Sequence, residues 1–251
     1  MGAVPGSTTL FALGSGTYGS HLTSRRQRIS PATTHGGPVT HLALASSGRP
    51  ELDAKADLRK RLRAERRAAV AALDPRTRAL LMMRPPAALA ARVPAGATIG
   101  LYRASPDEAP TLGYAKWFHE AGHPLALPAF TTREAPMHFR AWANPYDDEG
   151  FEPGPWTWRI AQPHAAAAAV IPHVVFVPLV GFSAAGGRLG QGGGHYDRWL
   201  ADHPQALAIG LAWDAQLVED LPTEAHDRML DAVVTPTRLY GPFERARVTA
   251  R

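Results

Sequence analysis

Beyond residue 90 the chain alternates short apolar runs with amphipathic ones. Strand-like runs occupy 97–104, 124–130, 137–142, 174–182, 206–213 and 231–237, and helix-like runs occupy 112–122 and 196–203. This alternation favours a mainly parallel sheet covered by helices. The run VVFVPLVGF at 174–182 is apolar without a period of two, as expected for a central strand buried on both faces. We therefore predict an α/β fold of three layers, a mainly parallel sheet flanked by helices, in a single domain.

A long basic helix is predicted before this alternating region. Asp53 is a suitable N-cap for it, and Asp74-Pro75 ends it. One apolar stripe contains Leu58, Leu62, Ala69, Val70 and Leu73, and the other faces carry Lys55, Arg59, Arg63, Arg66 and Arg67. A second helix is predicted to start near Pro75 and to break at Pro85-Pro86.

Residues 1–50 differ from the rest of the chain. Of these 50 residues, 26 are Gly, Ser, Thr or Pro, four are Arg, and none is acidic. Such a segment buries too little apolar surface to offset its ordering entropy. We expect a disordered leader, either a transit peptide or the result of a start codon set too early, followed by the folded domain at 51–251. The string GSGTYG at 14–19 matches a dinucleotide-binding pattern, but no helix pattern follows it, so we interpret it as coincidence.

Composition excludes several classes of site. The chain has no cysteine, which rules out disulfides, thiolate zinc sites and cysteine nucleophiles and fits a cytoplasmic protein. Prolines interrupt the longest apolar stretch, 165–182, so we expect no membrane segment. Although the pI is near 9.9, 23 basic and 22 acidic residues follow position 50, so no basic surface for nucleic acid is expected.

The segment 186–194, GGRLGQGGG, contains six glycines in nine positions and leads directly into a helical pattern. Freed backbone N–H groups and a helix N-terminus together form a cradle for phosphate, and Arg188 adds a planar set of donors. Asp197, one turn into the helix, is suited to holding a Mg²⁺ ion that bridges to phosphate oxygens. A wide turn between strand and helix is the alternative. No GxxxxGK[ST] motif occurs, and the only lysines are Lys55, Lys60 and Lys116.

Four blocks in order resemble the 5-formyltetrahydrofolate cyclo-ligase family, also called 5,10-methenyltetrahydrofolate synthetases. They are KADLR at 55–59, PDEAPT at 106–111, VPLVGFSAAGGRLGQGGGHYDRWL at 177–200, and HDRMLD at 226–231 running into VVTP. The long glycine-rich block is highly specific, whereas the first two would be weak alone. The resemblance covers residues 53 to about 237.

The resemblance implies ATP- and Mg²⁺-dependent cyclisation of 5-formyltetrahydrofolate to 5,10-methenyltetrahydrofolate, with release of ADP and phosphate. It implies catalytic roles for Arg188 and Lys55, and metal ligation by Asp197 and Asp227. Substrate binding is expected at Glu108, Trp158 and Tyr196. ATP binding is expected at Lys55, Arg59, Gly187, Arg188, Leu189, Gly190, Gly192, Gly193, Gly194 and Tyr196.

Two positions depart from the family pattern: Ser183 stands where most relatives carry Asp, and His195 where they carry Tyr. Serine cannot supply charge, which keeps open a nucleotide- or folate-sensing module without turnover. His195 permits a metal-dependent hydrolase whose site combines His195, Asp197, His226 and Asp227. The partner expected is a small folate substrate, with no nucleic acid and no membrane, and the protein is expected to be a monomer. An organellar location is the alternative if residues 1–50 are a transit peptide.

Overall fold

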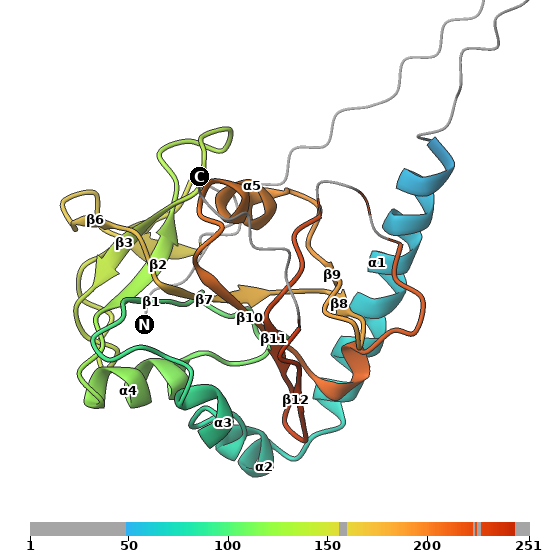
Figure 1. The fold of residues 1–251 in the computed structure, drawn as a ribbon, viewed down its shortest axis with the longest axis horizontal. Coiled ribbons are helices and arrows are strands. Elements are labelled where there is room, and N and C mark those ends of the chain that lie inside the picture. The colour runs from blue at the N-terminus through green and yellow to red at the C-terminus, as the bar shows by residue number, and fades with distance from the viewer. Residues whose placement is uncertain (1–48, 156–159, 223, 225–226, 244–251) are drawn as a thin grey trace, which may run out of the picture. The chain divides into compact units, whose positions relative to one another are not determined.

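A computed structural model of the chain describes residues 49–155, 160–222, 224 and 227–243, all within one unit, Ser46–Arg251 (Figure 1). The helices are α1 (Arg49–Ala71), α2 (Pro75–Leu80), α3 (Ala87–Ala90), α4 (Leu112–Glu120), α5 (His195–Asp202) and the 3-10 turn η1 (Asp214–Gln216). The strands are β1 (Ile99–Gly100), β2 (Leu125–Ala129), β3 (His138–Trp142), β4 (Phe151–Pro153), β5 (Ala161–Pro163), β6 (Ala169–Val170), β7 (Val174–Pro178), β8 (Gly181–Phe182), β9 (Arg188–Leu189), β10 (Leu207–Leu211), β11 (Ala232–Val234) and β12 (Leu239–Tyr240).

The main sheet has eight strands in the order β12-β11-β10-β7-β1-β2-β3-β6. The pairs from β11 to β2 are parallel, and antiparallel pairs add β12 at one edge and β3 and β6 at the other. In register, Val175 at the centre lies opposite Gly100 on one side and Ala208 on the other. The predicted α/β class is confirmed, with a parallel centre and antiparallel edges.

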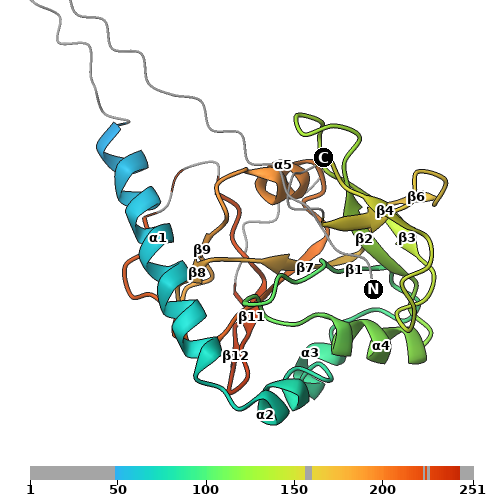
Figure 2. The ribbon, with the colours of Figure 1, turned by 180° about the vertical axis from the view of Figure 1, so that it is seen from behind.

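Helices cover both faces of this sheet (Figures 1 and 2). Val174 and Phe176 pack in a core cluster with Tyr114 of α4. Val175 and Val177 pack in a second cluster with Trp199 of α5. Successive side chains of a strand point to opposite faces, so β7 is buried on both, as its continuous apolar run predicts.

The run at 174–182 is not one strand, which corrects the prediction. β7 ends at Pro178, a residue without the N–H that a further parallel ladder bond requires. Gly181–Phe182 instead pairs with Arg188–Leu189 in a separate two-stranded hairpin. The first glycines of the segment 186–194 therefore close a β-turn, and only the later ones lead into α5.

α1 begins at Arg49, four residues before the predicted N-cap Asp53 and inside the predicted leader. Pro50 in its first turn costs no helical hydrogen bond, because the first N–H groups of a helix have no intrahelical partner. The rest of the predicted leader, residues 1–48, lies outside the described residues. Asp74 is an N-cap as well as a stop, since its Oδ1 accepts the N–H groups of Arg76 and Thr77 at the start of α2.

The inward face of α1 mixes apolar and cationic side chains, and here too the sequence assignment is wrong. Lys55 and Arg66, predicted on other faces, are each 4% exposed, and Leu62 beside them is 2% exposed. Leu62 packs with Leu189 of the hairpin and with Val180 just before it, and Figure 2 shows α1 running beside β8 and β9. The helix comes so close that a Cβ on Gly181 would stand 2.6 Å from Leu62 Cδ1. Among the described residues, no helix combines the length and apolar character needed to span a membrane.

Candidate active site

Lys55 on α1 lies between two carboxylates from the segment that precedes β11. Its Nζ donates to Asp227 Oδ2 at 2.8 Å and lies 3.0 Å from Glu224 Oε1. Burial lowers the pKa of Lys55, but the bonds to Asp227 and Glu224 outweigh it and leave the pKa above its ordinary value. The ammonium group is therefore charged at neutral pH and held in place by the two carboxylates.

Arg59 and Arg63 follow Lys55 at intervals of four and contact the glycine segment. Arg59 Nε donates to the carbonyl of Gly190 at 3.0 Å. Arg63 Nη2 donates to the backbone carbonyl of Gln191 at 3.0 Å and to its Oε1 at 2.8 Å. Positions four apart share a helix face, so α1 presents a row of cations to this loop.

Arg188 of β9 is the buried cation of the site. It is 6% exposed, its Nη2 donates to Asp197 Oδ1 at 2.5 Å, and burial lowers the pKa of its guanidinium. Its buried Nε finds no hydrogen-bond acceptor among the described residues. An orphaned buried donor is rare in native proteins, so this N–H group is a candidate donor to a bound ligand.

Asp197 of α5 also accepts the backbone N–H of Arg228 at 3.2 Å. The segment after the glycine loop and the segment before β11 therefore meet, as a joint metal role for Asp197 and Asp227 requires. Each carboxylate faces a cation, Arg188 and Lys55 respectively. The two carboxylates thus form, with these cations, one compact set of alternating charges.

The glycine loop leads directly into the N-terminus of α5. Its N-cap, Gly194, has φ +63°, a left-handed conformation that glycine adopts without strain, and no side chain caps the helix. In the described part of the chain, the N–H groups of Gly192, Gly193 and Gly194 donate to no protein acceptor. Such N–H groups at a helix N-terminus favour an anion.

The earlier residues of the segment are engaged within the β8–β9 hairpin. The Gly187 N–H donates to Ser183 Oγ at 3.1 Å, and the Gly187 carbonyl accepts the Ser183 N–H at 2.9 Å. Leu189 packs its side chain in the core. Ser183 thus closes the hairpin turn, a structural task that needs no charge. Nucleotide contacts from Gly187 and Leu189 stay predictions.

Glu108 lies across from the glycine loop, after β1. Its Oε2 accepts the Ser105 N–H at 2.8 Å, and its Oε1 accepts Gln191 Nε2 at 3.1 Å. Burial raises the pKa of the Tyr196 and Tyr102 hydroxyls, and the carboxylate of Glu108 raises both further. The predicted substrate residues Glu108 and Tyr196 therefore lie near each other, and both adjoin the predicted ATP site.

Sequence reasoning missed the group that holds Asp107, the residue before Glu108, in place. Arg66, buried on α1, donates through Nε at 3.1 Å and Nη2 at 2.7 Å to Oδ2 of Asp107. Trp213 Nε1 donates to the Asp107 carbonyl at 3.0 Å. The available signal was spacing: Arg59, Arg63 and Arg66 follow Lys55 at helical intervals, which places them on one face.

We expect Asp107→Asn to lower the free energy of unfolding by about 1.5–3 kcal/mol at neutral pH, because buried Arg66 loses its ionic partner. Burial raises the pKa of Asp107, but the bonds from Arg66 outweigh it and leave the pKa below its ordinary value. Stabilisation by such a carboxylate is complete above the unfolded-state pKa and is lost as the pH falls through the folded-state pKa. Urea unfolding from pH 7 to 3 should therefore show the two proteins converging below about pH 4.

Asp57→Asn, on an exposed position of α1, is the matched control and should change stability by less than about 0.5 kcal/mol. A gap between wild type and Asp107→Asn that stayed constant down to pH 3 would contradict this account of Asp107.

His195 begins α5 with its ring 4.9 Å, centroid to centroid, from that of Phe130, and its Nδ1 lies 3.2 Å from Arg198 Nη2. Burial, and then the charge of Arg198, lower the pKa of His195, so the ring is neutral at pH 7. Within the described ranges, no group of three or more His, Asp or Glu side chains is arranged to hold a metal. Trp158 and His226, named as substrate and hydrolase residues, lie outside the described residues.

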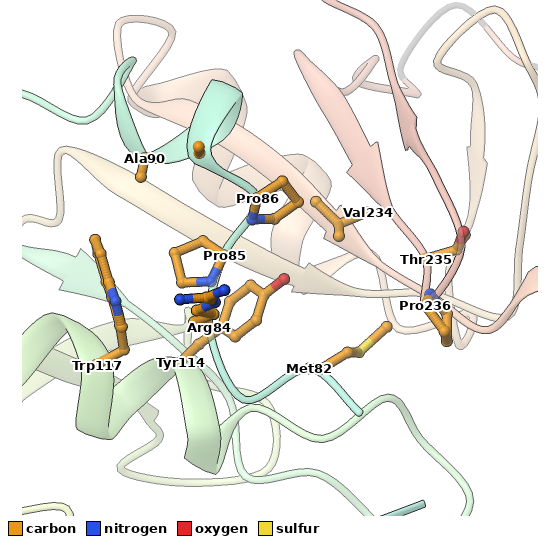
Figure 3. A pocket seen from close by; sticks show the side chains of 11 residues that line it. Met82, Arg84, Pro85, Pro86, Ala90, Tyr114, Trp117, Val234, Thr235 and Pro236 are labelled. Atoms are coloured by element: carbon orange, nitrogen blue, oxygen red, sulfur yellow. The ribbon is translucent and has the colours of Figure 1, made fainter. Parts of the chain in front are cut away.

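A pocket of about 540 Å³ lies apart from these residues (Figure 3). It is bounded by the turn before α3, by Tyr114 and Trp117 of α4, and by the end of β11. None of its lining residues was predicted as a site residue. The predicted residues therefore converge elsewhere, around the glycine loop, the N-terminus of α5 and α1.

Comparison with known proteins gives a consistent result. The sequence model of the 5-formyltetrahydrofolate cyclo-ligase family matches residues 51–236. A 5-formyltetrahydrofolate cyclo-ligase of Escherichia coli is 43% identical over 88 residues, which are 33% of this chain and 48% of that protein. One of Haemophilus influenzae is 48% identical over 56 residues, 22% of this chain and 30% of that protein.

Among solved structures, the 5,10-methenyltetrahydrofolate synthetase of Aquifex aeolicus aligns with a TM-score of 0.58 at 23% identity, covering 78% of this chain and 99% of that one. At this identity the likeness shows the fold alone. The chain spans about half the length, or less, of the curated relatives that it matches.

Proposed function

This chain belongs to the 5-formyltetrahydrofolate cyclo-ligase family, and we propose that it catalyses the ATP- and Mg²⁺-dependent cyclisation of 5-formyltetrahydrofolate to 5,10-methenyltetrahydrofolate, releasing ADP and phosphate. One observation carries the proposal: cations from α1 and β9 lie beside a loop whose Gly192, Gly193 and Gly194 N–H groups have no acceptor among the described residues, and Glu108 contacts the same loop. Anion-binding groups and a carboxylate for N–H donors thus stand side by side.

The chemistry explains why two kinds of site must adjoin. A formamide oxygen is a poor leaving group, so the γ-phosphoryl group of ATP is transferred to it, and ADP is released. The resulting imidate phosphate is attacked by the folate N10, the ring closes, and phosphate departs with the former formyl oxygen. Phosphoryl transfer depends mainly on positioning and charge neutralisation, so the protein need not supply a nucleophile.

The cations would neutralise the phosphates. Lys55 and Arg59 would act as a clamp on the triphosphate. Arg188, which is buried and whose Nε lacks an acceptor among the described residues, would donate to the transferred group. The N–H groups of Gly192, Gly193 and Gly194 and the N-terminus of α5 would donate to phosphate oxygens.

Asp197 and Asp227 fit a Mg²⁺ ion that arrives with ATP. Their carboxylates are the hard oxygen ligands that Mg²⁺ prefers, and Asp197 meets the segment of Asp227 through the Arg228 N–H. Bound Mg²⁺ would neutralise charge on the phosphates. Lys55 and Arg188, which pair with these carboxylates, would hold them in place and would donate to the phosphates.

The folate would bind on the Glu108 side of the loop. The pterin amino and ring N–H groups are donors that a carboxylate accepts well. The Tyr196 ring, half-buried beside the loop, would contact both substrates, and Trp158 stays a proposed substrate contact. We further propose a monomeric, cytoplasmic enzyme, with an organelle as the alternative if residues 1–50 form a transit peptide.

The test is an absorbance assay of methenyltetrahydrofolate formed from 5-formyltetrahydrofolate by the full chain. Turnover is expected only when ATP and Mg²⁺ are both present. Turnover without ATP, or binding of both substrates without turnover, would overturn the assignment, the second outcome in favour of a sensing module.

We expect His195→Tyr to keep at least about half of the turnover, because the edge-to-face contact with Phe130 suits either aromatic ring. Steady-state kinetics and metal analysis of the purified variant check this. A hydrolytic metal site would require the imidazole, so an inactive variant that had also lost a tightly bound zinc ion would contradict the cyclo-ligase assignment.

A further inference from the structure

Gln191 lies in the glycine loop between Gly190 and Gly192, and its side-chain amide is bonded at both ends by groups from other elements. Its Oε1 accepts Arg63 Nε at 3.1 Å and Arg63 Nη2 at 2.8 Å. Its Nε2 donates to Glu108 Oε1 at 3.1 Å. One side chain thus joins α1, the proposed ATP loop and the proposed folate carboxylate.

The chemistry of the two neighbours selects an amide at this position. An arginine only donates hydrogen bonds and a carboxylate only accepts them, so the residue between them must offer one acceptor and one donor. A glutamate would repel Glu108, and a lysine or arginine would repel Arg63. The same requirement fixes the orientation of the amide, with Oε1 toward Arg63.

The loop itself cannot hold this arrangement. Glycines flank Gln191 on both sides, and glycine leaves the backbone more conformational freedom than any other residue. Among the described residues, the side chains that hold the tip of the loop are Arg59 and Arg63 on α1 and, through Gln191, Glu108. The other oxygen of Glu108 is fixed by the Ser105 N–H, so Glu108 is the firmer partner.

We propose that Gln191 is a positioning residue that couples the two substrate sites, an inference that rests on the proposed function. With the Gln191 amide in place, the glycine loop and Glu108 adopt one joint arrangement. A folate that orders Glu108 then also orders the loop for ATP, and ATP bound in the loop orders Glu108 for the folate. Linkage requires the two effects to be equal in size.

Calorimetric titration of the full chain measures the coupling. The two ligands are 5-formyltetrahydrofolate and the non-hydrolysable ATP analogue β,γ-imido-ATP, the latter in the presence of Mg²⁺. In the wild type, each ligand should tighten binding of the other by about fivefold or more. In Gln191→Ala the factor should fall to about one, while each ligand alone binds within about threefold of the wild type. If Gln191 had a purely structural role, the alanine variant would bind both ligands more weakly, but each ligand would still tighten binding of the other by the wild-type factor.

Two further variants sharpen the result. Gln191→Asn keeps the amide on a shorter side chain that cannot reach both neighbours, so it should also lose the coupling. This variant keeps the test valid if the alanine variant fails to fold. Gln205→Ala, at an exposed position away from the site, should keep it. If the wild type turns over substrate but shows no coupling between the two ligands, the inference is overturned. A Gln191→Ala variant that retains the coupling would overturn it as well. Absence of wild-type turnover would instead overturn the proposed function.

Discussion

Asp197→Asn is expected to lose turnover by about a hundredfold or more in a protein that still folds, although its free energy of unfolding falls because buried Arg188 loses its ionic partner. Asparagine keeps an oxygen that can accept from Arg188 and from the Arg228 N–H, so the local structure survives. It removes the charge proposed to hold Mg²⁺ at the phosphates, and loss of one electrostatic contact to a transition state typically costs about 2.7–4 kcal/mol. The measurement is kcat and KM for ATP across a Mg²⁺ series, repeated with Mn²⁺.

Partial recovery at raised Mg²⁺ or with Mn²⁺ is expected if Asp197 is a metal ligand. Asp202→Asn, on the exposed last turn of the same helix, removes the same charge and should leave turnover unchanged. If activity instead fell equally at every metal concentration, Asp197 would act through Arg188 alone, and its assignment as a ligand would be wrong.

Lys55→Ala is expected to weaken ATP binding by about ten- to a hundredfold, since a charge-assisted contact of this kind is worth about 1.5–3 kcal/mol. Folate affinity should change much less, because Lys55 pairs with Asp227 and Glu224 rather than with the Glu108 side of the loop. Titration with β,γ-imido-ATP and, separately, with 5-formyltetrahydrofolate provides the comparison.

Lys60→Ala is the matched control: it removes the same charge from an exposed position of α1 and should leave both affinities within about twofold. A Lys55→Ala variant that lost folate affinity while keeping ATP affinity would mean that this face of α1 serves the pterin.

The layers of the fold could be predicted from the sequence because apolar periodicity records burial directly. The run at 174–177 packs side chains into two core clusters on opposite faces, as its pattern indicates. Short strands such as β4, β5 and β12 were missed, since two or three residues carry no measurable period. The true end of β7 depends on Pro178, whose missing N–H outweighs the apolar run that continues past it.

The sequence predicted the kinds of residue in the site better than the contacts between them. The glycine segment indicated an anion site, and the structure places a helix N-terminus and a buried arginine there. Hydrophobic periodicity put Lys55 and Arg66 outside the apolar stripe of the helix, because it counts a charged residue as unburied unless its partner is known. Those partners, Asp227 and Asp107, lie far away in sequence, and only the fold brings them to α1.

The polar inner face of α1 also bears on the order of folding. Lys55 and Asp227 are 172 positions apart, Arg59 and Gly190 are 131 apart, and Arg63 and Gln191 are 128 apart. Contacts between such distant positions require closure of long loops, whereas α1 can form its own helical bonds locally. We therefore expect the strands to pair first and α1 to dock afterwards. On a ribosome, Arg59 and Arg63 would meet their partners only after residue 191 has emerged, and Lys55 only after residue 227 has emerged.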